Sequence, residues 1–289
     1  MSDLFRSEKA PSDWTSDFLE SLNIRMQPVT GKEFGFPSDL PSLDHMDHDL
    51  VTASGSDTNP NQAPGTAATL MKLVIATGAG ATRETSIDVA IQRVLEDAGF
   101  ESAISGTTVN GHWPTPLMMS GQLLHGLTDV CVLSRKDAFL ILPVENKTIS
   151  NPTPTPDVEA QLTAQAISIF QTHNKHLADA GLPTLSTMRI PCIRMSGTTP
   201  TFYIIPVTRK LSDTLATDPC TRPQTPTMVL KHEITHLYPG WNREEGMRDP
   251  GFREVALKSF VAFKGLAQAC WRDMDQDDSL LHLYDAVSS

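Results

Sequence analysis

Three residues with the chemistry of a hydrolytic site stand close together in the middle of this chain. Asp129 lies within an apolar run, residues 126–133, and a second apolar run that starts at residue 138 ends in Glu145 and Lys147. Two carboxylates supply the oxygen ligands that Mg²⁺ prefers, and this cation keeps several of its waters when a protein binds it. A lysine beside a metal-bound water can orient that water or take its proton. These residue types predict metal-dependent hydrolysis of a phosphodiester.

The two apolar runs must be paired strands if these residues are to meet. A short polar stretch separates them, as in a β-hairpin. Side chains alternate between the faces of a strand, so Glu145 and Lys147 are expected to project to the same side. Pairing about the turn brings Asp129 to the Glu145 end of the second strand. Pro143 cannot donate to a ladder, which predicts a bulge, a partly unpaired strand or an edge position there.

Helices and further strands are predicted on both sides of this hairpin. Residues 84–100 have an apolar stripe at helical spacing that ends at Gly99. Residues 158–180 form a second amphipathic helix behind a proline-rich loop, with Asp157 as its expected N-cap. Further strands are expected at 101–113, 188–195, 201–208 and 227–233, and a last helix at 252–271. The sequence thus predicts an α/β fold with a mixed central β-sheet flanked by helices.

The arrangement of Asp129, Glu145 and Lys147, followed by a helix that bears Gln161, resembles the active-site core of the PD-(D/E)XK nuclease superfamily. In that superfamily a helix precedes a three-stranded meander, and a second helix and another strand follow. The resemblance implies a restriction-endonuclease-like core over roughly residues 80–235. It also implies that Asp129 and Glu145 bind the metal and that Lys147 assists the attacking water. Thr128 stands where the superfamily's name has proline, a proline that many members lack.

A wider similarity covers roughly residues 80–270. These residues resemble a group of fungal, mainly basidiomycete, proteins, and the similarity is carried by residues 159–167, 197–208, 246–247 and 262–264.

Supporting groups of the site are implied by the same resemblance. The superfamily's first helix often supplies an acidic residue, so Glu84 is expected as a third metal ligand, and Asp88 is the second candidate for that role. An acid at the start of a helix is explained equally well by the helix dipole. Gln161 and Gln165 are one turn apart, and a glutamine of this helix helps to hold the site in related nucleases; ordinary surface amides have the same spacing. The site predicted for Mg²⁺ or Mn²⁺ consists of Asp129, Glu145 and Glu84 as ligands, and of Asp129, Glu145, Lys147 and Gln161 as catalytic residues.

A rival motif, His232-Glu233-Ile-Thr-His236, matches the H-E-x-x-H pattern of zinc proteases. In those enzymes both histidines stand on one helical face and the glutamate is the base. Here residues 227–231 are typical of a strand, and Pro239 would stop a helix soon after the motif. A zinc protease is therefore the less favoured alternative.

The net charge of −11 argues against tight non-specific binding to nucleic acid. Residues 1–70 hold eleven acids and four bases and residues 273–289 hold five acids and no base, so residues 71–272 are close to neutral. Basic residues gather in one stretch of this middle part and either contact phosphates or form a solvated face: Arg189, Arg194, Arg209, Lys210, Arg222 and Lys231. The expected partner is DNA or RNA. A catalytically inactive module that binds nucleic acid or protein remains the main alternative, and a homo-oligomer is compatible with either.

The 289 residues are expected to form an N-terminal arm (1–50), a flexible linker rich in small and polar residues (51–69), the core (70–272) and an acidic tail (273–289). The arm either packs on the core or stays separate. Four cysteines at no metal-binding spacing favour a reducing compartment. Neither a signal peptide nor an apolar run of membrane length is evident, so an intracellular protein of the cytoplasm or nucleus is expected.

Overall fold

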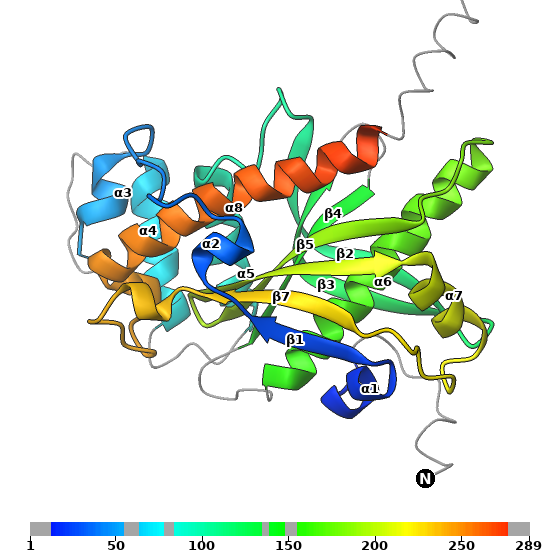
Figure 1. The fold of residues 1–289 in the computed structure, drawn as a ribbon. Coiled ribbons are helices and arrows are strands. Elements are labelled where there is room, and N and C mark those ends of the chain that lie inside the picture. The colour runs from blue at the N-terminus through cyan, green and yellow to red at the C-terminus, as the bar shows by residue number, and fades with distance from the viewer. Residues whose placement is uncertain (1–12, 55–63, 78–83, 135–138, 148–154, 277–289) are drawn as a thin grey trace, which may run out of the picture.

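A seven-stranded mixed sheet forms the centre of the computed structural model (Figure 1). The structure describes residues 13–54, 64–77, 84–134, 139–147 and 155–276. The strands lie in the order β1-β7-β6-β5-β4-β3-β2; β1 pairs with β7 and β4 with β5 in parallel, and the other neighbours are antiparallel. Their bounds are β1 (Ile24–Pro28), β2 (Thr107–Met119), β3 (Gln122–Ser134), β4 (Phe139–Lys147), β5 (Thr187–Ser196), β6 (Thr199–Thr208) and β7 (Thr227–Glu233). The predicted α/β class with a mixed sheet is confirmed.

Helices cover both faces of this sheet (Figure 1). They are α1 (Ser16–Ser21), α2 (Gly31–Phe34), α3 (His48–Thr52), α4 (Pro64–Thr77), α5 (Glu84–Asp97), α6 (Thr155–Asp179), α7 (Arg209–Thr217) and α8 (Pro250–Gln276), with 3₁₀ helices η2 (Thr235–Leu237) and η3 (Gly246–Arg248). The longest of them, α6 and α8, carry too many polar residues for a membrane span, and within the described ranges no helix is long and apolar enough for one.

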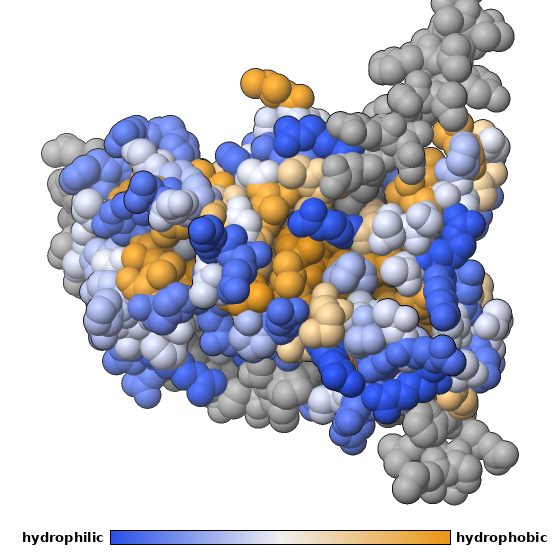
Figure 2. All heavy atoms as spheres, in the orientation of Figure 1, coloured by the Kyte–Doolittle hydropathy of each residue, from blue (hydrophilic) through white to orange (hydrophobic). Residues whose placement is uncertain are grey.

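The sheet separates two hydrophobic cores. Alternate residues of one strand enter opposite cores: on β6, Phe202 packs with α5 and α8, whereas Tyr203 packs with α1, α6 and α7. Burial on both faces explains why the central strand β6 is a nearly continuous apolar run. Figure 2 shows hydrophobic side chains over the strands beside α8, framed by hydrophilic ones, so that α8 covers only part of its face.

The hairpin β3–β4, the hairpin β5–β6 and the strand β7 are confirmed, although β3 begins at Gln122, earlier than the apolar run predicted. A bulge also exists near Pro143, because the register between β3 and β4 shifts at Val132/Leu133. Pro143 itself pairs with Cys131, and the ladder from β4 to β5 begins only at Val144. The missing N–H of Pro143 therefore lies where β4 is paired on one side only.

Two predicted boundaries are wrong. The strand expected at 101–113 starts only at Thr107 and continues to Met119. This strand contains two prolines, and it can do so because β2 lies at the edge of the sheet, where its outer side needs no backbone donors. Asp157 is not the N-cap of the following helix, because α6 already begins at Thr155. The Asp157 carboxylate instead accepts a hydrogen bond from the backbone N of Ser16 at 3.0 Å, which ties α1 to α6.

Of the two alternatives for the N-terminal arm, packing on the core is the one adopted. β1 extends the sheet beside β7, and Trp14 is 1% exposed. The expectation of a flexible linker is wrong for residues 64–69, which begin α4; the hydroxyl of Thr69 there donates to the Asp97 carboxylate at 2.9 Å. Residues 55–63 of the predicted linker and 277–289 of the predicted acidic tail lie outside the described residues.

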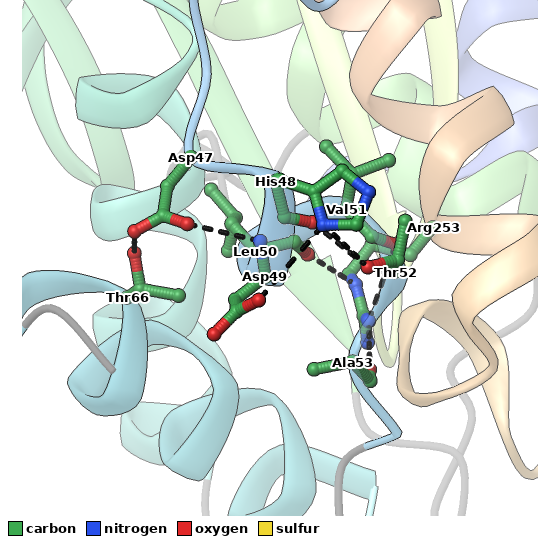
Figure 3. Close-up of polar contacts among 9 residues, drawn as sticks. All are labelled: Asp47, His48, Asp49, Leu50, Val51, Thr52, Ala53, Thr66 and Arg253. Atoms are coloured by element: carbon green, nitrogen blue, oxygen red, sulfur yellow. Dashed lines mark hydrogen bonds and ion pairs between the residues drawn. The ribbon is translucent and has the colours of Figure 1, made fainter. Parts of the chain in front are cut away.

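A buried arginine joins the arm to the last helix (Figure 3). Arg253 of α8 is fully buried, and its guanidinium donates to backbone carbonyls at the end of α3 and in the turn around η3. The acceptors are Leu50 (2.7 Å), Val51 (3.3 Å), Ala53, Met247 (3.1 Å) and Arg248 (3.3 Å). One side chain thus satisfies the carbonyl groups of two chain segments nearly 200 residues apart in sequence.

Candidate active site

Asp129 and Glu145 stand at the end of the β3–β4 ladder. Val130 and Val144 are its last paired residues, and Asp129 directly precedes the first while Glu145 directly follows the second. The two acids therefore occupy the next opposed positions of the two strands, as the hairpin predicts. Lys147 is the last residue of β4. The three predicted residues are thus carried by neighbouring strand ends.

The backbone opposite Asp129 is strained. In the pairing of β2 with β3, His112 lies between Gly111 and Trp113, which face Val130 and Thr128, so its partner position is Asp129. His112 has a φ of 53°, a left-handed conformation that side-chain-bearing residues rarely adopt. Such strain persists only where the surrounding structure imposes it, and it is frequent at functional sites. Sequence reasoning left His112 without a role.

Glu145 is a buried carboxylate that α6 holds in place. It is 6% exposed, and its Oε2 accepts a hydrogen bond from Gln165 Nε2 at 2.8 Å. The same Nε2 lies 3.5 Å from the carbonyl O of Leu127, at the margin of hydrogen bonding. Burying a carboxylate is costly unless charge or hydrogen bonds compensate. The Gln165 amide therefore fixes the orientation of Glu145 and connects it to β3.

Gln165 is a glutamine of α6 that reaches Glu145, and the catalytic role of Gln161 stays a prediction. Gln161, the predicted catalytic amide, lies one turn earlier on α6 and is partly buried. Gln165 is 2% exposed, and its Oε1 has no hydrogen-bond partner among the residues that the structure describes. Amide and carboxylate oxygens are hard donors, so the side chains of Gln165, Glu145 and Asp129 are of the type that Mg²⁺ or Mn²⁺ prefers.

Among the described residues, no three or more His, Cys, Asp or Glu side chains come together as a metal cluster. Two carboxylates completed by water are a ligand set typical of Mg²⁺. Glu84 is the first residue of α5, which packs on the sheet face opposite α6. Its role as a third ligand stays a prediction.

Beyond Glu145, a row of polar residues crosses the sheet beneath α6. Glu145 is paired with Arg194 on β5, Arg194 with Thr201 on β6, and Thr201 with Glu233 on β7. Sequence reasoning missed this row. Its signal was a polar residue near one end of each of these four strands, and their alignment becomes visible only once the strand order is known.

A second set of contacts lies one step inside this row. The Tyr203 hydroxyl donates to Glu159 Oε1 of α6 at 2.9 Å, and Lys231 Nζ lies 3.0 Å from the same oxygen and 2.9 Å from Glu233 Oε1. Burial, followed by the Glu159 carboxylate, raises the pKa of Tyr203 well above its usual value, whereas the charge of Arg194 acts in the opposite direction. Burial would lower the pKa of Lys231, but its two carboxylate partners together raise it. One lysine thus pairs with both Glu159 and Glu233.

The H-E-x-x-H motif does not form a helical zinc-binding face. His232 is on β7, and His236 is in η2, with 5.9 Å between the two ring centroids. The His232 ring is 1% exposed, packs against Phe34 and Phe36, and places Nδ1 3.1 Å from the carbonyl O of Val29. His232 therefore joins β7 to the segment after β1.

This buried histidine predicts a loss of stability in mild acid. Burial lowers the pKa of His232 despite the opposing bond to Val29. As the pH falls below about 6.5, the unfolded chain takes up a proton at this residue before the folded protein does, so the free energy of unfolding decreases. We expect the urea midpoint to fall less between pH 7.5 and 5.5 in His232→Asn than in the wild type. His125→Asn, at an exposed position of β3, should keep the wild-type dependence; equal slopes in all three proteins would contradict the assignment.

No protein-family model matches this chain, and no curated protein matches it either. The features that point to a function are therefore geometric: a buried carboxylate held by an amide, a second acid at the next opposed position, and a lysine at the end of the strand that carries Glu145.

Proposed function

We propose that this chain hydrolyses phosphodiester bonds of nucleic acid with Mg²⁺ or Mn²⁺. The observation that carries the proposal is Glu145, a buried carboxylate beside the Asp129 strand end and oriented by Gln165. The element order α5-β2-β3-β4-α6-β5 supports it, because it is the order implied by the resemblance to PD-(D/E)XK nucleases.

Each residue has a distinct role in this proposal. Asp129 and Glu145 hold the cation, and Gln165 keeps the Glu145 carboxylate in a fixed orientation. A bound Mg²⁺ would supply Lewis acidity at the phosphoryl oxygen and a more acidic water. Lys147, at the end of the Glu145 strand, orients the attacking water or takes its proton. Thr128, fully buried, places its hydroxyl 3.3 Å from the carbonyl O of Val144 and so holds the two strand ends together.

One observation favours the alternative of an inactive binding module. The hairpin that carries Asp129, residues 107–134, contains no Lys or Arg and no acid other than Asp129. A nuclease that contacts a long duplex needs several basic side chains along the phosphate backbone of the nucleic acid. If the chain is a nuclease, we therefore expect it to contact only a short stretch of its substrate.

Cleavage of labelled oligonucleotides tests the proposal. We expect the purified chain to cut at least one of single-stranded DNA, duplex DNA, single-stranded RNA or duplex RNA with Mn²⁺ or Mg²⁺, and to stop when EDTA is added. The measurement is product formation on a denaturing gel. Glu145→Gln, purified in the same way as the wild type, is the control for contaminating nucleases. If no substrate is cut with either cation, the inactive module becomes the better description.

A further inference from the structure

Arg194 is the neighbour of Glu145 across the β4–β5 ladder. Residues paired in parallel strands project to the same face, and on β5 the alternate residues Ile190 and Cys192 belong to the core beneath α6. The influence of Arg194 on the pKa of Tyr203, which also lies in that core, places its charge on the same side. The guanidinium therefore stands beside the candidate active site.

Arg194 forms no ion pair within the described part of the chain. Its side chain contacts the Tyr203 hydroxyl, and its buried Nε has no hydrogen-bond acceptor there. A guanidinium remains protonated in proteins, and its five N–H groups cannot go unmet in a partly buried place without a loss of stability. A guanidinium without an ion pair and with an unsatisfied N–H group is suited to bind an anionic ligand.

The nearby carboxylates are already engaged elsewhere. Glu159 accepts from Tyr203 and pairs with Lys231, and Lys231 also pairs with Glu233. This chain of contacts fixes the Tyr203 ring next to Arg194, whereas Arg194 itself forms no ion pair among the described residues. Tyr203 and Glu159 are thus positioning residues for the guanidinium.

We propose that Arg194 binds a phosphate group of the substrate at the Glu145 site. Two N–H groups of its planar guanidinium donate to two of the phosphate oxygens. This inference rests on the proposed function, since it assigns the phosphate-bearing substrate to that site. Arginine suits this role because its donors match the spacing of phosphate oxygens, whereas lysine offers only a point charge. The contacted group is a phosphodiester of a nucleic acid, and inorganic phosphate has the same oxyanion chemistry.

The first test measures binding without cleavage. With Ca²⁺ in place of Mg²⁺, the affinity for a fluorescein-labelled oligonucleotide is measured by anisotropy at several salt concentrations. We expect Arg194→Met to weaken binding about tenfold to a hundredfold, and the log–log salt slope to fall by about 0.7–0.9, the contribution of one phosphate. Arg194→Lys should keep the salt slope and recover only part of the affinity, which a merely structural role would not produce.

A matched control and a second probe separate this inference from the proposed function. Arg189→Met removes an exposed arginine from the same strand and should leave affinity and slope unchanged. Inorganic phosphate should raise the melting temperature of the wild type, and Arg194→Met should lose that shift. If no oligonucleotide is bound or cut but the phosphate effect depends on Arg194, the nuclease proposal fails and the phosphate site stands. Unchanged oligonucleotide binding in Arg194→Met, or no phosphate effect in a wild type that binds no oligonucleotide, would overturn the inference.

Discussion

Replacement of Glu145 by Gln should lower the rate of phosphodiester cleavage about 10³-fold or more. The amide has the same shape and can still accept the hydrogen bond from Gln165, but it lacks the negative charge that binds a divalent cation. A loss of about 4 kcal/mol in transition-state stabilisation corresponds to this factor, and removal of the cation's contribution is at least of that size. Single-turnover cleavage with saturating enzyme and Mn²⁺ measures the chemical step directly.

Two further variants decide what a loss of activity means. Lys147→Ala should also reduce cleavage, because the attacking water loses its partner. Glu244→Gln changes an exposed acid in the same way as Glu145→Gln, and it should retain full activity. Cleavage that survives both Glu145→Gln and Lys147→Ala would place the chemistry elsewhere in the chain. The melting temperature of each variant shows whether the fold is intact.

The parts of the fold that follow local rules could be predicted from the sequence. β7 has the bounds that its apolar pattern predicted, and the β5–β6 hairpin is marked by a turn with Gly197 at a φ of 57°. The opposition of Asp129 and Glu145 follows from the same rules, because a hairpin fixes which ends of two strands meet. These features require only neighbours in sequence.

The parts that depend on distant partners could not be predicted. Gln161 and Gln165 are four residues apart, so they lie on nearly the same face of α6, one turn apart along its axis. The contact of Gln165 with Glu145 therefore depends on where α6 lies along the sheet, and the sequence of the helix does not fix that position. The partner of β1 is more than 200 residues away on β7, and no local pattern indicates that pairing.

Arg253 illustrates the same difficulty with the largest expected effect on stability. On sequence it is one charged residue in an amphipathic helix, whereas the structure buries it completely against the end of α3 (Figure 3). Burial lowers its pKa to about 10, with Asp249 acting in the opposite direction, which corresponds to a desolvation penalty of about 3 kcal/mol. Its five carbonyl acceptors offset that penalty, since each one left without a donor costs about 1–3 kcal/mol.

Arg253→Met is therefore expected to lower the free energy of unfolding by about 3–5 kcal/mol, although it removes a buried charge. The methionine fills much of the same volume, so the loss reports mainly on the orphaned carbonyls rather than on a cavity. Arg253→Lys should be almost as damaging, because an ammonium cannot reach acceptors in two segments at once. Arg248→Met removes only a partly exposed ion pair with Glu245 (3.6 Å) and should stay within about 0.5 kcal/mol of the wild type. Urea unfolding, followed by tryptophan fluorescence, measures the stability of all three variants. A wild-type midpoint for Arg253→Met would mean that water can replace the guanidinium at these carbonyls.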